Sequence, residues 1–254
     1  MKRMVSRVSG RGIRVACAAA GLSALFAGSA VAQSTIFNIP STDTVEKSKF
    51  YVEFDVLPQA PAPDVGDMIT IYNPRVVVGV APDVEVGVNF PVYHTSANSG
   101  YIQPNVKWKF FKNDMGLAAS AGGVLNTPLN NREGQGSWGY IYGNISKKWT
   151  GDKGPRVTVG PYGVVADQSS GLATFVGTRG GLLVGYEQPL GGPVSFVADW
   201  FSGKNTLGYF TPGVSVTLPH SGLLNIGYSI GNDVKDETAN YKDRYLFVYY
   251  GVTF

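Results

Sequence analysis

Apolar and polar residues alternate in steps of two along most of this chain. In residues 84–92, valine or phenylalanine occupies every even position, and Glu85 and Asn89 lie between them. Residues 102–110 repeat the pattern, with Lys107 among the intervening positions. Because successive side chains of a strand point to opposite faces, this period predicts strands with one apolar and one polar face.

Twelve segments of about ten residues carry this pattern, and ten residues is the length expected for a tilted strand that crosses an outer membrane. The expected strands are 49–57, 68–80, 84–92, 101–111, 115–127, 137–148, 156–166, 180–189, 194–202, 207–218, 222–231 and 244–254. Asn73 and Pro74 interrupt the second segment, so the number of strands is defined only to within two.

The connections between these segments alternate in length. Five are short turns, at 81–83, 112–114, 151–155, 190–193 and 219–221. The intervening ones are mostly longer and polar, at 58–67, 93–100, 128–136, 167–179 and 232–243, with 203–206 as the exception. Outer-membrane barrels have short turns on one side and long loops on the other, whereas soluble sandwiches have no reason to sort them. The sequence therefore predicts an all-β fold, a transmembrane antiparallel barrel of about twelve strands over residues 49–254.

The same alternation turns one set of mostly polar side chains toward the barrel interior. A charge on the lipid face would cost about 2–4 kcal/mol near the membrane midplane. The predicted lumen-lining residues are Glu53, Asp55, Arg75, Glu85, Asn89, Lys107, Lys109, Glu187, Asp199, Asn225, Tyr245 and Tyr249. They fit either a salt-bridged interior that only stabilises the barrel or a narrow channel with a charged lining, and Tyr245 and Tyr249 either line a passage or pack against the N-terminal segment.

Aromatic residues near the expected strand ends fit interfacial girdles, where Trp and Tyr gather at the membrane surface. The residues expected there are Trp138, Tyr140, Tyr142, Trp149, Trp200, Phe201, Tyr209 and Phe210.

The last strand ends on a terminal phenylalanine. Its apolar face consists of Leu246, Val248, Tyr250, Val252 and Phe254. This strand resembles the C-terminal recognition strand of bacterial outer-membrane barrels, which implies that the barrel-assembly machinery reads these residues and that outer-membrane lipids surround the protein.

The start of the chain is typical of a secretory signal peptide. Five basic residues precede an Ala-rich run that ends in a small-x-small motif at residues 30–32, so residues 1–32 are expected to be removed. Removal leaves 16 of the 21 basic residues against 18 acidic ones, a net charge of −2, which gives no reason to expect nucleic-acid binding. The only cysteine, Cys17, lies in this segment, so no disulfide is expected. Only 15% of residues are charged, against about 25% in soluble domains. These features predict the bacterial outer membrane, with both termini periplasmic.

Residues 33–48 precede the first strand and lie either in the periplasm or in the lumen as a plug. An apolar cluster of Ile36, Phe37 and Ile39 favours docking.

Motifs for catalysis are sparse. His94 and Ser96 have the His-x-Ser spacing of outer-membrane lipid hydrolases, with the imidazole as base and the hydroxyl as nucleophile, but no third group at a matched position orients the ring. The sequence has no metal-spaced His or Cys cluster, phosphate loop or dinucleotide fingerprint, so no cofactor is expected and a non-enzymatic role is favoured.

One hairpin carries a family resemblance. Residues 75–91 (RVVVGVAPDVEVGVNFP) and residues 122–128 (GGVLNTP) are similar to the strands and turns of the family called MetA pathway of phenol degradation. The resemblance implies an outer-membrane barrel that helps small, often aromatic, compounds to cross the membrane. We therefore expect a passive channel for small solutes of unknown identity. The alternatives are a closed structural or adhesion barrel and a lipid hydrolase that uses His94 and Ser96.

Overall fold

The structure is a computed structural model that describes residues 34–60, 68–95, 98–130, 136–149, 154–166, 175, 177–232 and 244–254. The predicted signal peptide, Gln33 and Ser96 lie outside these residues. Within the described ranges, no helix is long and apolar enough to cross a membrane.

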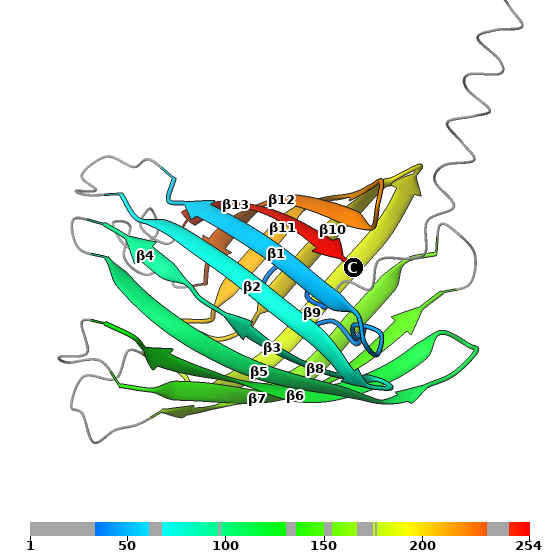
Figure 1. Cartoon of the computed structure of the whole chain (residues 1–254), viewed down its shortest axis with the longest axis horizontal. Coiled ribbons are helices and arrows are strands. Elements are labelled where there is room, and N and C mark those ends of the chain that lie inside the picture. The colour runs from blue at the N-terminus through cyan, green and yellow to red at the C-terminus, as the bar shows by residue number, and fades with distance from the viewer. Residues whose placement is uncertain are drawn as a thin grey trace, which may run out of the picture.

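The described residues form one antiparallel sheet of thirteen strands (Figure 1). They are β1 (Phe50–Pro58), β2 (Thr70–Ala81), β3 (Val84–Asn89), β4 (Val92–His94), β5 (Ser99–Lys112), β6 (Leu117–Pro128), β7 (Trp138–Lys148), β8 (Arg156–Ala166), β9 (Gly180–Gly191), β10 (Val194–Phe201), β11 (Tyr209–Leu218), β12 (Gly222–Gly231) and β13 (Arg244–Thr253). Both β3 and β4 pair with β2 and with β5, so they are two parts of one wall strand, interrupted at Phe90 and Pro91. The wall thus has twelve strands, as predicted, and β2 runs unbroken through Asn73 and Pro74.

The sheet closes on itself because β1 pairs with both β2 and β13. The β1–β13 register runs from Tyr51 opposite Thr253 to Val56 opposite Val248. Closure leaves no free sheet edge, so the backbone amides and carbonyls of the wall are paired within the sheet, as a lipid environment requires. The barrel prediction is confirmed.

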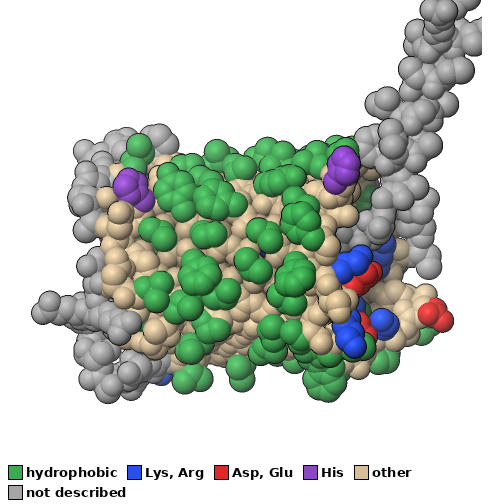
Figure 2. All heavy atoms as spheres, in the orientation of Figure 1, with side chains coloured by type: hydrophobic (Ala, Val, Ile, Leu, Met, Phe, Trp, Pro, Cys, Tyr) green, Lys and Arg blue, Asp and Glu red, His purple; other side chains and the backbone are tan. Residues whose placement is uncertain are grey.

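Large apolar side chains cover the outside of this barrel. Trp108, Ile141 and Val165 are 56%, 67% and 71% exposed, and hydrophobic side chains are spread over the length of the wall in Figure 2, while charged ones gather at one end. A continuous apolar surface of this extent is unfavourable in water. The outer face is therefore built for contact with lipid.

The two ends of the barrel differ. At one end, here called the short-turn end, tight connections join β2 to β3, β9 to β10 and β11 to β12. Residues with positive φ make these turns, among them Asp83, Gly191, Gly192 and His220. The opposite end, where β1 ends and β2 begins, is called the long-loop end.

The buried core lies inside the barrel and is built around the N-terminal segment. Ile36, Phe37 and Ile39 pack among aromatic side chains from β7, β8, β10 and β13. A second small cluster joins Val45 to Tyr51 and Val77. A soluble protein has a largely polar outer surface. Here the outer surface of the wall is apolar and faces lipid, and the core is enclosed by the strands.

Candidate functional site

Residues 34–45 lie in the lumen and are called the plug below. The sequence left open whether this segment lies in the periplasm or in the lumen, and the structure places residues 34–45 in the lumen. The plug backbone is held by polar side chains of the wall, since the Asp199 Oδ2 atom on β10 accepts the amides of Phe37, Asn38 and Ile39 at 2.9, 2.5 and 2.9 Å. The Asn144 side chain on β7 donates to the Pro40 carbonyl at 2.6 Å. A segment without regular secondary structure thus gains the partners that its buried amides and carbonyls need.

The Phe37 ring fits a socket in the wall. It makes edge-on contacts with Phe247 and Tyr249 of β13, at centroid distances of 5.4 and 6.1 Å. Gly213 on β11 and Gly227 on β12 lie behind the ring, and an added Cβ on Gly227 would come within 2.6 Å of the Phe37 Cζ atom. The two glycines therefore leave the space that the ring occupies.

Replacing Gly227 with alanine is expected to push Phe37 out of its socket and to loosen the plug. Overpacking of this kind costs about 1–3 kcal/mol. The expected result is more frequent current steps across planar bilayers than the unchanged protein gives. The matched control is Gly163→Ala, because an added Cβ there meets no atom within 4 Å. Equal conductance of the two variants would contradict the role assigned to the socket.

Two buried ion pairs surround the start of the plug. The Lys107 ammonium lies 3.0 Å from the Glu85 carboxylate, and the Arg75 guanidinium lies 3.2 Å from Glu53. Lys107 also donates to the Ser34 carbonyl at 2.7 Å, and Glu85 accepts the Val45 amide at 2.7 Å. Buried charges are tolerated when each is paired and hydrogen-bonded, and here the plug supplies part of that bonding.

A third charged group holds the plug near the short-turn end. Arg156, at the start of β8, bonds both to Asp43 of the plug and to Glu187 of β9, the latter at 2.8 Å. Burial alone would raise the pKa of Asp43, but the Arg156 guanidinium holds that pKa below its usual 3.8.

This pair predicts how plug docking depends on pH. Since the pKa of Asp43 is lower when docked than when free, its contribution is complete above its ordinary pKa and is lost as the pH falls through the docked pKa. We expect little change from Asp43 between pH 7 and 5, and more frequent release of the plug below about pH 4. Bilayer recordings across this range test the prediction, and Asp43→Asn should remove the part of the acid response that this pair produces.

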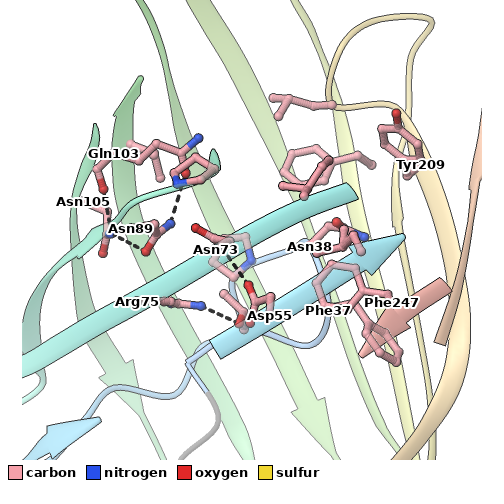
Figure 3. Close-up of a pocket in the computed structure, with 18 of the residues that line it drawn as sticks. Phe37, Asn38, Asp55, Asn73, Arg75, Asn89, Gln103, Asn105, Tyr209 and Phe247 are labelled. Carbon is pink, nitrogen blue, oxygen red and sulfur yellow. Dashed lines mark hydrogen bonds between the residues drawn. The ribbon is translucent and has the colours of Figure 1, made fainter. Parts of the chain in front are cut away.

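A cavity of about 320 Å³ lies between the plug and the long-loop end. Its floor includes Ser34, Phe37 and Asn38, and Leu57 and Tyr209 are among the residues toward its other end. Figure 3 shows polar side chains on one side of this space and aromatic ones on the other. The cavity is the candidate functional site.

The structure places the predicted lumen-lining residues in two groups. Seven line the cavity: Glu53, Asp55, Arg75, Glu85, Asn89, Lys107 and Tyr245. The other five lie beside the plug or toward the short-turn end: Lys109, Glu187, Asp199, Asn225 and Tyr249. Among the described residues, Asp55 and Asp199 form no ion pair of the kind that the salt-bridged interior would require. Asp55 accepts from Asn73 at 2.7 Å, and Asp199 accepts from plug amides. Lys109 pairs with Asp83 in a short turn, at 3.2 Å.

The prediction of an aromatic girdle was wrong for five of its eight members. Trp138, Tyr140, Tyr142, Phe201 and Tyr209 point into the lumen and line the cavity. The other three, Trp149, Trp200 and Phe210, are exposed on the outside. Strand parity carried the missing signal, since Trp138 is six residues from inward-facing Asn144 and Phe201 is two from Asp199.

The His94 side chain lies outside the barrel at the end of β4. Its Nδ1 atom lies 2.7 Å from the Asn98 Oδ1 atom, and its ring lies 6.4 Å from that of Tyr72. The sequence did not identify a third group that could orient the imidazole. In the structure, the Asn98 side chain lies within hydrogen-bonding distance of it. Among the described residues, no cluster of His, Cys, Asp or Glu is arranged to hold a metal ion.

Neither a protein-family model nor a curated protein matches the sequence, so the resemblance to the MetA-pathway family stays a prediction. Solved structures do match. An active-site mutant of outer membrane phospholipase A from Escherichia coli aligns at 12% identity with a TM-score of 0.51, over 88% of this chain and 98% of that one. An outer membrane channel from Pseudomonas putida F1 aligns at 11% identity with a TM-score of 0.55, over 87% of this chain and 99% of that one. The fold is that of a porin-like outer-membrane barrel, and two different activities occur on it.

Proposed function

We propose that this protein is an outer-membrane channel for the passive diffusion of small solutes, including apolar or aromatic ones, and that the plug is its gate. The observation that carries the proposal is the cavity in the lumen, which ends on a segment held by side-chain hydrogen bonds, by the ion pair of Asp43 with Arg156 and by the apolar packing of residues 36–39. None of these contacts is part of the strand pairing of the wall. Displacement of the plug would connect the cavity to the short-turn end.

In this proposal the protein lies in the bacterial outer membrane with both termini in the periplasm, after removal of residues 1–32. The apolar face of β13, which includes Leu246 and Tyr250, would be recognised by the barrel-assembly machinery together with exposed Phe254, which follows the strand. The likeness to an outer membrane channel supports this role at the level of the fold.

Single-channel conductance and solute flux in lipid bilayers test the proposal. The protein is compared with a variant that lacks residues 33–48, and heat-modifiable migration on gels shows that both are folded. We expect conductance that rises on truncation. Silence in both folded proteins would contradict the channel and leave the closed structural or adhesion barrel, whose external loops contact partners.

The contact between His94 and Asn98 favours a lipid hydrolase as the second candidate. An amide oxygen that accepts the Nδ1 proton leaves Nε2 free to act as a general base, and an exposed position on the lipid side suits an acyl-ester substrate. Ser96 would be the nucleophile. Hydrolysis of phospholipid in mixed micelles by the purified protein tests this, and activity retained in Ser96→Ala or in Asn98→Ala at the unchanged rate would exclude it.

A further inference from the structure

One wall of the lumen cavity carries a row of linked carboxamide side chains. Gln103 on β5 donates to the Asn126 Oδ1 atom on β6 at 2.8 Å and accepts from Asn89 on β3 at 3.2 Å. Asn105 donates to the Asn89 Oδ1 atom at 3.3 Å. These amides hold one another in place across three neighbouring strands, and we call the four residues the amide row. Asn89, Gln103 and Asn105 line the cavity, whereas Asn126 holds Gln103 from outside the lining.

The facing wall is aromatic and apolar. It includes Phe37 of the plug, Phe247 of β13 and Tyr209 of β11, which lie opposite the amide row in Figure 3. Phe201 and Tyr140 extend this surface, with their rings edge-on at 5.8 Å. Aromatic side chains present flat apolar faces that pack well against a ring.

The two basic residues beside the cavity are compensated within the protein. Arg75 and Lys107 are the two basic residues that line it, and each lies within 3.2 Å of a carboxylate, Glu53 or Glu85. The described lining residues therefore include no uncompensated cation to attract an anion. Transfer of an anion into this space would cost its hydration without a basic partner that is not already paired. A cation would meet only Asp55, a buried carboxylate that accepts from Asn73 at 2.7 Å, and would also lose its hydration.

The size of the cavity limits the solute further. Ligand pockets typically have volumes of about 300–1,000 Å³, and this cavity of 320 Å³ lies at the small end. It suits a molecule with a single ring. A solute with hydroxyl groups around its whole circumference would place some of them against the aromatic wall, where they would lose hydrogen bonds.

We propose that the cavity binds an uncharged, single-ring solute that has a flat apolar face and one hydrogen-bonding edge, with the edge on the amide row and the face on Phe247, Phe37 and Tyr209. Amides offer both donors and acceptors, so a carboxamide or hydroxyl substituent meets the edge requirement. This inference rests on the proposed function in naming the solute class of the channel.

The test is equilibrium binding to the folded full-length protein in lipid nanodiscs, measured by calorimetry against empty nanodiscs. The probes share one ring and differ in one group: benzamide and benzyl alcohol, then toluene, benzoate and benzylammonium. We expect the first two to bind at least tenfold more tightly than the other three. Toluene binding as tightly as benzamide, or tightest binding of either charged probe, would overturn the proposal.

Variants assign the binding to the amide row. Gln103→Leu removes the central amide and should weaken benzamide binding about tenfold, the effect of one lost hydrogen bond of typical strength. Gln188→Leu is the matched control, because Gln188 lies near the end of β9 and does not line the cavity. Asn89→Val replaces Gln103→Leu if that variant does not fold, and unchanged affinity in the folded variant used would overturn the assignment.

Binding is measured without flux, so the two proposals fail separately. Benzamide binding without conductance would leave the solute class standing and contradict the channel. Conductance with the expected probe order absent would contradict the solute class alone.

Discussion

Replacing Asp199 with alanine is expected to release the plug and open the channel. One oxygen of this carboxylate accepts three consecutive plug amides, from Phe37, Asn38 and Ile39. Hydrogen bonds to charged groups contribute about 1.5–3 kcal/mol each, and a buried amide left without an acceptor is costly. Even with partial replacement by water, docking should weaken by about 3 kcal/mol or more. Conductance should approach that of the variant that lacks residues 33–48.

The matched control for this variant is Asp83→Ala. Asp83 lies in a short turn, where it pairs with Lys109 and Lys112 rather than with the plug. Its removal should leave the open probability unchanged. If Asp199→Ala conducts no more than Asp83→Ala in the same bilayers, the plug is held by other contacts or is not a gate.

The second large effect is expected for Lys107→Met, on the stability of the whole protein. Lys107 and Glu85 are almost fully buried, and they lie 3.0 Å apart. Removing one member of a buried pair leaves an uncompensated charge and destabilises by about 3–5 kcal/mol. Urea titration of the refolded protein in lipid vesicles should therefore show a lower free energy of unfolding.

Two comparisons identify the cause of that loss. The double variant Glu85→Gln with Lys107→Met removes both charges and should recover most of the stability. Lys112→Met makes the same substitution at an exposed pair with Asp83, where the expected change is below about 1 kcal/mol. A double variant as unstable as Lys107→Met would show that the charge imbalance is not the cause.

The strand pattern was predicted closely from the sequence. The expected strand 222–231 coincides with β12. The expected strand 84–92 is divided by Phe90 and Pro91 into β3 and β4, and β4 continues to His94. Glu85 and Lys107 lie in the interior that parity predicted for them, and both are almost fully buried. These features are local, since each side chain's face follows from its place in a strand.

Aromatic residues show where local reasoning was insufficient. Trp138 and Trp149 were assigned one role from their place near strand ends, yet Trp138 is buried in the lumen and Trp149 is exposed outside. Nearness to a strand end does not distinguish the two faces. Only the combination of strand parity with the inward position of a polar neighbour, such as Asn144, separates them.

The sequence by itself determined the barrel, the strand positions and most of the inward and outward faces, because lipid penalises each misplaced polar group independently of the rest of the chain. The tertiary structure alone decided that residues 34–45 fill the lumen, that Asp199 binds backbone amides and that the amide row faces an aromatic wall. These contacts join residues as far apart as Ile39 and Asp199. Their partners are set by barrel closure and by the path of an irregular segment. Neither of these produces a periodic pattern of apolar and polar residues in the sequence.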